Sequence, residues 1–334
     1  MALLSSGALT LADHAKRLDP DGKVAKVAEL LSQSNEILED AVFMEGNLPT
    51  GHRINIRTGL PVVYWRAINQ GVPLSKSTTA QVDEACGMLE AYSEVDVDLA
   101  ELNGNTGAFR MSEDMAFLES MNQTQASTMF NGNPGSDPRQ YLGLAPRYSQ
   151  ISGAGNSQNI IDGAGVSTNN ASIYLVVWGE NTVFCPFPKG SKAGLQHEDL
   201  GKDTVLDGLG GRYQAYRTHY QWKNGLVVKD WRYVVRIANI NTANLVSESG
   251  AADLVKLMSR ALDRIPNFAM GRAAFYMNRT VYSFLRVQAL AKSQNVLAVE
   301  SGLSQFGTPM SWTSFQGIPL RKVDQLLNTE ARVV

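Results

Sequence analysis

The chain has 334 residues, of which 44% are hydrophobic and 19% are charged, below the charged share of about 25% in an average globular protein. Its length allows a sizeable core in one large or two ordinary domains. With 30 basic and 32 acidic residues the net charge is −2, which argues against tight, sequence-reading binding to nucleic acid but leaves room for weak, nonspecific contact.

The two cysteines and the distribution of apolar residues argue against several classes of protein. Cys86 and Cys185 lie far apart and belong to no Cys/His cluster, which argues against a zinc site and a disulfide framework. The first residues have no charged region before their short apolar stretch, unlike a signal peptide. No apolar run approaches the roughly 20 residues needed to cross a bilayer. We expect a soluble, unsecreted protein with free thiols.

The N-terminal region combines an aperiodic segment with a helical pattern. Residues 1–22 have no periodicity and end in the turn sequence Asp19-Pro20-Asp21-Gly22, which predicts an extended arm. An amphipathic helix is predicted over 23–39, because apolar residues then recur at helical spacing. These residues are Val24, Val27, Ala28, Leu31 and Leu38. A helix behind a loose arm is expected to dock on its own body or on a neighbour.

A long hairpin is predicted next. Residues 52–57 alternate polar and apolar, residues 62–66 are rich in β-formers, and residues 78–82 and 89–99 return as strand. Turn residues place the tip near 69–77. An isolated hairpin is at best marginally stable in water. We therefore expect a neighbouring subunit to cover it.

A long helix and a linker are predicted after the hairpin. Ser112 can cap a helix whose first turn carries acidic residues, and Asn131-Gly132 ends it. Residues 149–171 are rich in Gly, Ser and Asn, which predicts a flexible connection.

The middle of the chain reads as mainly β from 172 to 241. Predicted strands cover 172–178, 182–187, 213–222 and 226–240, with a hairpin turn at Asn224-Gly225.

The last hundred residues alternate helix and strand. A helix is predicted over 254–265, a strand over 273–277, a helix capped by Asn278 through about Ser293, and a strand over 321–323.

The candidates for chemistry are weak. His197-Glu198-Asp199 is the best metal candidate, but a polar turn explains it better, because a metal needs convergent ligands. Asp96 and Asp98 could be paired carboxylates, although a solvated strand face is the simpler interpretation. Cys185 lies in an apolar sequence typical of a core. We therefore predict that the protein is not an enzyme and that it has no catalytic residue, cofactor or metal site.

Aromatic residues are concentrated in 174–233, which keeps one alternative open. They could form a ligand surface, so a carbohydrate-binding β module or an uncharacterised enzyme centred on 172–241 is the alternative function. Core and cross-strand packing is the more common use of aromatic residues in strands.

The order of the segments resembles the major capsid proteins of tailed bacteriophages with the Hong Kong 97-type fold, in particular the short-tailed branch with a separate scaffolding protein. Residues 65–75 are similar to the family's hairpin tip, 88–96 to its return strand, and 112–132 to its spine helix. Ala274-Phe275-Tyr276-Met277-Asn278 and Phe315-Gln316-Gly317-Ile318-Pro319-Leu320 resemble its late strand–helix step and late G-x-P strand. Residues 149–249 fit the pattern poorly.

The resemblance implies an α+β fold with four parts. These are an N-terminal arm and helix (1–40), an extended β-hairpin loop (41–97), a peripheral domain with the spine helix (98–148), and an axial domain (149–334). The axial domain would carry a β-rich insertion near 172–241, and C-terminal strands could return to the peripheral domain.

The resemblance also implies a function and partners. The chain would self-assemble as hexamers and pentamers into the icosahedral shell around phage double-stranded DNA, within the virion and, during assembly, the host cytoplasm. A separate scaffolding protein, a portal and a cement or decoration protein would be its partners, with weak nonspecific contact to packaged DNA and none to a membrane. The expected intersubunit residues at the hairpin tip are Trp65, Gln70, Gly71, Pro73, Ser75 and Lys76.

Overall fold

The computed structural model describes most of the chain. The described residues are 9, 13, 32–102, 104–207, 210–290, 297–303 and 309–334. Apart from residues 9 and 13, the predicted N-terminal arm lies outside them, as does the predicted helix up to residue 31. Residues 32–36 are not helical, and helix α2 covers only Ile37–Asp40, so the predicted helix does not extend to residue 39 as one element.

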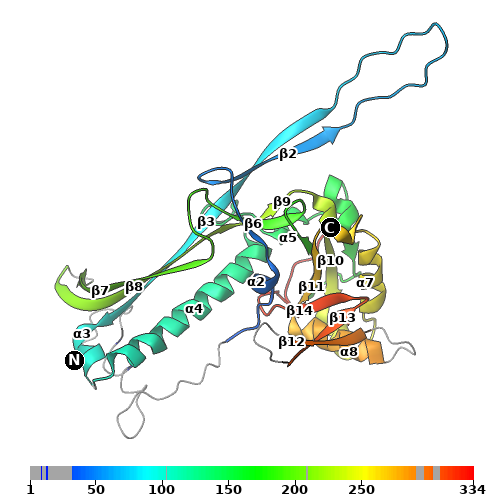
Figure 1. Ribbon diagram of the computed structural model, residues 1–334. Helices are drawn as coiled ribbons and strands as arrows, with labels where there is room; N and C mark the ends of the chain where they lie inside the picture. The colour runs from blue at the N-terminus through cyan, green and yellow to red at the C-terminus, as the bar shows by residue number, and fades with distance from the viewer. Residues whose placement is uncertain are drawn as a thin grey trace.

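A ten-stranded sheet forms the core of the described body (Figure 1). Its path is β1 (Phe43–Glu45), β6 (Val183–Phe187), β5 (Asn170–Trp178), β11 (Arg272–Met277), β14 (Ile318–Lys322), β13 (Pro309–Phe315) and β12 (Leu297–Leu303). Beside this path β10 (Val234–Asn241) pairs with β5, β4 (Ile160–Asp162) with β10, and β9 (Val227–Val228) with β6. The sheet is mixed, since β11 is parallel to β14 but antiparallel to β5.

Both faces of this sheet are covered, which is why β5 is buried at every position. Successive side chains of a strand point to opposite faces. Tyr174, Val176 and Trp178 therefore enter one core cluster, and the residues between them enter the other. The first cluster includes the end of helix α4 (Thr106–Asn131) and α5 (Leu144–Arg147). The second includes α6 (Thr242–Ser247), α7 (Leu254–Leu262) and α8 (Arg279–Leu290).

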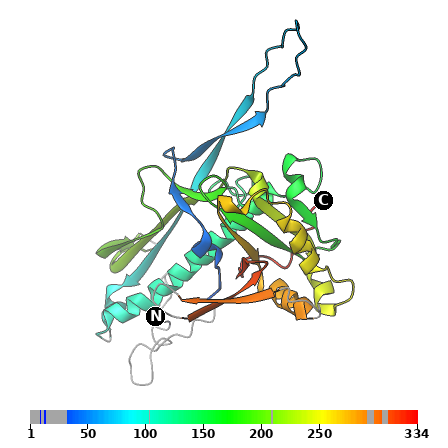
Figure 2. The ribbon, with the colours of Figure 1, turned by 45° about the vertical axis from the view of Figure 1, so that its right-hand side comes forward.

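A separate four-stranded sheet has the order β2-β3-β8-β7. It consists of β2 (Gly51–Gly59), β3 (Thr78–Asp96), β8 (Arg212–Gly225) and β7 (Leu195–Leu206). Strand β3 is shared between two partners, because residues 78–85 pair with β2 and residues 86–96 pair with β8. The same strand thus continues from the body into the extended arm (Figure 2).

Three predicted boundaries are wrong. Helix α4 begins six residues before Ser112, which therefore lies inside the helix and does not cap it. Strand β3 ends at Asp96, and helix α3 (Val97–Glu101) replaces the last part of the predicted return strand. The predicted flexible connection contains the 3₁₀ helix η1 (Gly155–Asn159) and strand β4, where Ile160 and Ile161 are buried.

The β-rich stretch also differs from its prediction. Asn224-Gly225 is not a hairpin turn, since β8 runs through both residues and pairs Gly225 with Cys86. The hairpin partner of β8 is β7, a strand that the sequence reading missed because it assigned 195–199 to a turn. Residues 172–241 are consequently divided between the two sheets, although we expected one segment.

The late chain follows the prediction in part. Strand β14 begins three residues before the predicted strand over 321–323, and strands β12 and β13 were not predicted. Strand β11 and helices α7 and α8 lie where the apolar spacing placed them, and Asn278 Oδ1 accepts the Val281 N–H at 2.8 Å as the predicted cap. The turn between β13 and β14 contains only Gln316 and Gly317, both with positive φ. No helix within the described ranges is long and apolar enough to span a membrane.

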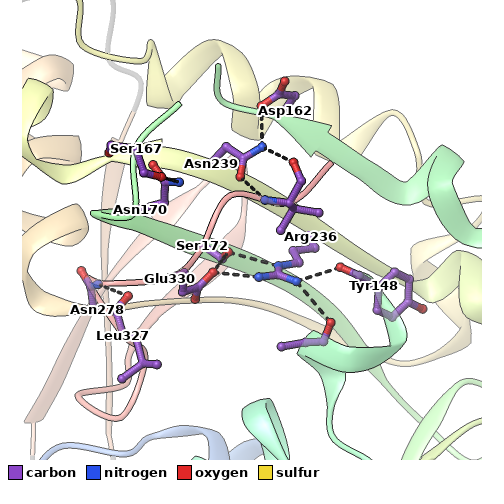
Figure 3. Close-up of polar contacts among 12 residues, drawn as sticks. Tyr148, Asp162, Ser167, Asn170, Ser172, Arg236, Asn239, Asn278, Leu327 and Glu330 are labelled. Atoms are coloured by element: carbon purple, nitrogen blue, oxygen red, sulfur yellow. Dashed lines mark hydrogen bonds and ion pairs between the residues drawn. The ribbon is translucent and has the colours of Figure 1, made fainter. Parts of the chain in front are cut away.

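The C-terminal residues 330–333 are held against the ten-stranded sheet by hydrogen bonds between buried polar groups (Figure 3). Arg236 on β10 donates to Glu330 Oε2 at 2.7 Å, to Ser172 Oγ at 3.1 Å and to the Tyr148 carbonyl at 2.8 Å. The Asn239 side chain donates from Nδ2 to the Val333 carbonyl and accepts the Val333 N–H at Oδ1, with both hydrogen bonds at 2.8 Å. Because these hydrogen bonds and the ion pair with Glu330 offset the free energy of removing the guanidinium from water, Arg236 can be buried here.

Candidate intersubunit surface

The loop at residues 60–77, called the arm tip below, joins β2 to β3 and lies far from the rest of the described chain (Figure 1). It is a loop rather than a continuation of the strand ladder, so the predicted strand over 62–66 is wrong. The Gln70 N–H donates to the Ala67 carbonyl at 3.2 Å, and Asn69 between them has a φ of 66°. The Ser75 hydroxyl donates to the Val62 carbonyl at 2.7 Å and joins the two sides of the loop.

The arm tip exposes a concentration of large apolar side chains. Trp65 and Leu74 reach 105% and 103% of their full exposure. The others in the loop are Leu60, Val62, Val63, Tyr64, Ile68 and Val72. Contiguous apolar surface of this kind marks an interaction site, and Trp and Tyr are enriched among the residues that dominate binding energy.

All six predicted contact residues lie in this loop and are exposed. Their contact with a neighbouring subunit stays a prediction. The residues named from the sequence are mostly turn-forming, and most of the exposed apolar side chains around them were not named. The available signal was the run from Leu60 to Trp65, which is apolar without alternating. Strand and exposed loop cannot be told apart from such a short run, because both tolerate β-branched residues.

The base of the arm, unlike its tip, is packed. Ile54 on β2 is buried against Phe184 and Val227 of the body. Glu84 on β3 forms a two-point ion pair with Arg147, with N–O distances of 2.5 and 2.7 Å. Arg147 also donates to the Leu226 carbonyl at 3.0 Å. The arm therefore leaves the body in a fixed direction.

The neighbouring residue on β3 makes a similar pair at the surface. Asp83 binds Arg53 through two bonds of 2.6 Å, but both side chains are about half exposed. The hydrogen bond from Arg53 lowers the pKa of the Asp83 carboxyl below its ordinary value. Solvent screens this exposed pair, so we assign the fixed arm direction to Glu84 and Arg147.

The weaker metal and carboxylate candidates do not form sites. Asp199 on β7 binds Arg110 at 2.7 Å, and Glu198 faces away from His197 and Asp199, because strand side chains alternate. Within the described ranges no group of three or more His, Cys, Asp or Glu side chains could hold a metal ion. Asp96 caps helix α3 by accepting the Asp98 N–H at 2.9 Å.

Several of the aromatic candidates and the thiol lie in the core, whereas Tyr213, Tyr216 and Trp222 on β8 are half-buried. Tyr174, Trp178 and Phe184 are fully buried, so they cannot form a ligand surface. Cys185 is also fully buried, and burial raises the pKa of its thiol to about 12. Such a thiol stays protonated and poorly nucleophilic near neutral pH.

An extended hairpin arm, a long helix beneath it and a mixed sheet flanked by helices define the Hong Kong 97-type capsid fold, as the segment order predicted. A family model, major capsid protein GP7, matches residues 19–334, and the chain belongs to this family. A chain in a cryo-EM structure of bacteriophage Epsilon15 is 34% identical with a TM-score of 0.77, covering 100% of this chain and 99% of that one. No curated protein matches.

More distant likenesses include the capsid of bacteriophage JBD30, with 9% identity, a TM-score of 0.48, and coverage of 90% of this chain and 95% of that one. The capsid of a native GTA particle has 8% identity, a TM-score of 0.46, and coverage of 70% and 99%. Both are too distant to add to the assignment. The family places the chain in the virion as a subunit of the icosahedral bacteriophage shell.

Proposed function

We propose that the arm tip makes the main contact between neighbouring subunits of the shell. The observation that carries this proposal is the full exposure of Trp65 and Leu74 at the end of an arm with a rigid base. Covering one such side chain contributes about 1.5–3 kcal/mol. Each arm then supplies only a modest free energy, and repetition around closed rings makes the whole shell stable.

Hexamers and pentamers are the rings that this contact would build. Subunits in the two rings meet at slightly different angles, and the open loop beyond β2 can adapt while the base stays fixed.

We further propose that the arm, α4 and the four-stranded sheet act as the peripheral domain, and that the ten-stranded sheet and its helices act as the axial domain. The packing of α4 onto both sheets supports a close link between the two.

The proposed partners follow from family membership. A separate scaffolding protein would guide assembly in the host cytoplasm, a portal would occupy one vertex, and a cement or decoration protein would bind the outside. Contact with packaged DNA would be weak and nonspecific, which agrees with the net charge of −2. The chain would act as a structural protein and not as an enzyme.

Assembly of arm variants tests the proposal. Deleting 69–76 should give a soluble, folded subunit that fails to form shells by size-exclusion chromatography and negative-stain microscopy. Leu74→Ala should weaken assembly, whereas Leu206→Ala, which truncates an exposed leucine on β7, should weaken it less. Circular dichroism checks that each variant is folded. Closed shells from the deletion variant would contradict the proposed role of the arm.

The alternative of a carbohydrate-binding module gains no support. Tyr174, Trp178 and Phe184 on β5 and β6 are buried, and strands β7 and β8 belong to the sheet that carries the arm.

A further inference from the structure

Arginine side chains that are shielded from water in this subunit are paired with carboxylates, with one exception. The described part of the chain has six arginines that are buried or partly buried. Five of them form ion pairs, namely Arg110, Arg147, Arg217, Arg236 and Arg321. The side chain of the sixth, Arg264, forms no ion pair or hydrogen bond with any described residue. A charge that is partly withdrawn from water without a partner is costly, so a bound anion would stabilise Arg264.

A second guanidinium group without a partner lies beside Arg264. Arg260 is in the last turn of α7, and Arg264 is in the turn that follows this helix. Burial and the nearby charge of Arg260 both lower the pKa of Arg264. Asp263 lies between the two in the sequence, but no ion pair joins it to either guanidinium in the described ranges. Two positive charges held together in this way favour an anion between them.

The two arginines line an open depression of about 670 Å³ between the end of α7 and the 3₁₀ helix η1. Gln158, Asn159 and Asp263 complete its lining. The buried Asn159 donates from Nδ2 to the carbonyls of Arg232 and Val234 at 2.9 and 3.0 Å, which holds η1 against the start of β10. The neighbouring Gln158 is exposed, and its amide makes no hydrogen bond to a described residue. It is therefore a third donor group available to a ligand.

The chemistry of this lining selects a phosphate group. Guanidinium groups bind phosphate through two parallel hydrogen bonds, and the Gln158 amide adds a neutral donor. A carboxylate has only two oxygens to share among these donors, whereas a phosphate has more. The depression is open, so it can accept a phosphate that belongs to a polymer. Asp263 repels any anion at the same place and keeps the affinity low.

A row of positive charge leads from the depression along α7. Lys256 is exposed and lies four residues before Arg260, so both side chains are on the same side of the helix. They are about 6 Å apart along the helix axis. Arg264 follows after four more residues. A linear polyanion fits such a row better than an isolated ion does.

We propose that Arg260 and Arg264, together with Gln158, bind a phosphate group of the packaged DNA. The inference rests on the proposed function, because the subunit meets packaged DNA only as part of a shell. Helix α7 covers the face of the ten-stranded sheet opposite to α4, so the site is separate from the arm and turns this face towards the interior. Each contact is weak, and its repetition over the shell holds the DNA close to the wall.

Thermal unfolding of the unassembled full-length subunit tests the phosphate site. An anion that binds only the folded subunit raises its unfolding temperature. At equal ionic strength, sodium phosphate should raise this temperature above its value in sodium chloride, and Arg264→Gln should remove most of the rise. Arg212→Gln, which removes an exposed and unpaired arginine of β8, should leave the rise unchanged.

Three results would contradict the phosphate site. One is a rise that survives Arg264→Gln. The second is an equal, Arg264-dependent rise in sodium acetate, which would assign the site to the carboxylates of a protein partner. The third is a clearly lower unfolding temperature of Arg264→Gln in chloride, because Arg264 would then have a structural partner within the subunit.

Binding of a short DNA duplex distinguishes the DNA backbone from free phosphate. In fluorescence anisotropy, Arg260→Gln combined with Arg264→Gln should weaken binding several-fold. It should also reduce the slope of log K against log salt by about 1, as expected for the loss of one phosphate contact. Arg212→Gln combined with Lys223→Gln removes the same charge from β8 and should change both values less. Phosphate binding with an unchanged DNA affinity in the first variant would overturn the assignment to DNA.

The arm deletion separates this inference from the contact proposed for the arm tip. Subunits that lack 69–76 retain α7 and η1, so they should bind phosphate and DNA like the parent chain even though they form no shells. Loss of the phosphate-dependent rise in this variant would overturn the site on α7. Shell formation by the same variant would contradict only the role of the arm.

Discussion

Substituting Glu84 and Asp83 separately tests whether burial or geometry makes the base of the arm stable. The two residues are neighbours on β3, and each accepts two hydrogen bonds of 2.5–2.7 Å from an arginine. The Glu84 and Arg147 side chains are only 10% and 12% exposed, whereas those of Asp83 and Arg53 are 54% and 46% exposed. Removing one charge from a buried pair leaves the other uncompensated, at a cost of about 3–5 kcal/mol.

Glu84→Gln should therefore lower the free energy of unfolding by about 3 kcal/mol, the low end of that range, because the amide keeps one acceptor for Arg147. Asp83→Asn makes the same chemical change one residue away and should cause no measurable loss. Urea unfolding of the unassembled subunit, followed by tryptophan fluorescence, gives both values.

A double substitution completes this test. Replacing Glu84 and Arg147 together by methionine removes both buried charges and should cost less than the sum of the two single replacements. If Glu84→Gln and Asp83→Asn destabilise the subunit equally, burial does not decide the strength of these pairs and the reasoning is refuted.

Three further predictions concern other parts of the body. Asn239→Ala removes both hydrogen bonds to Val333 and should lower the free energy of unfolding by about 2 kcal/mol in urea titrations. Gly317→Ala should cost about 1 kcal/mol in thermal unfolding, because φ is 81° there. Burial raises the pKa of Cys185 from 9.0 to about 12, so its contribution to stability is complete below pH 9 and is lost as pH rises toward 12. Urea midpoints between neutral pH and about pH 10 should fall less steeply in Cys185→Ala than in the parent chain.

The parts of the fold predicted correctly are those with strong local signals. Strand β5 is a short run of apolar residues, and helix α7 repeats apolar residues at helical spacing. Helix α8 begins after Asn278, whose side chain supplies a cap that can be read from the sequence. These signals need no knowledge of distant residues.

The errors arise where distant partners decide the local structure. Asn224-Gly225 has the composition of a tight turn, yet β8 continues through it because Cys86 of β3 supplies the pairing partner. Strand β7 lies at an edge of the four-stranded sheet, carries polar side chains on both faces and has no buried position, so no regular apolar alternation marks it in the sequence. Helix α4 starts early because Phe109 is buried against Val95 and Ala100, a contact that no cap signal marks.

The position of the exposed arm tip was predicted from the sequence, but its apolar composition was not. A hairpin too long to be stable alone led us to expect cover by a neighbour, which stays a prediction, and residues 60–77 form the exposed end. Which side chains dominate could not be inferred, because a sequence does not say that Leu60 to Trp65 leave the ladder after β2 ends at Gly59.

Strand β3 has a mechanical consequence for the shell. Its 19 residues span about 60 Å, pairing with β2 in the arm at one end and with β8 at the other. Hydrogen bonds in an antiparallel pair run perpendicular to the strands. Tension along the arm therefore loads the β3–β8 ladder in shear, so that many bonds resist together instead of separating one at a time.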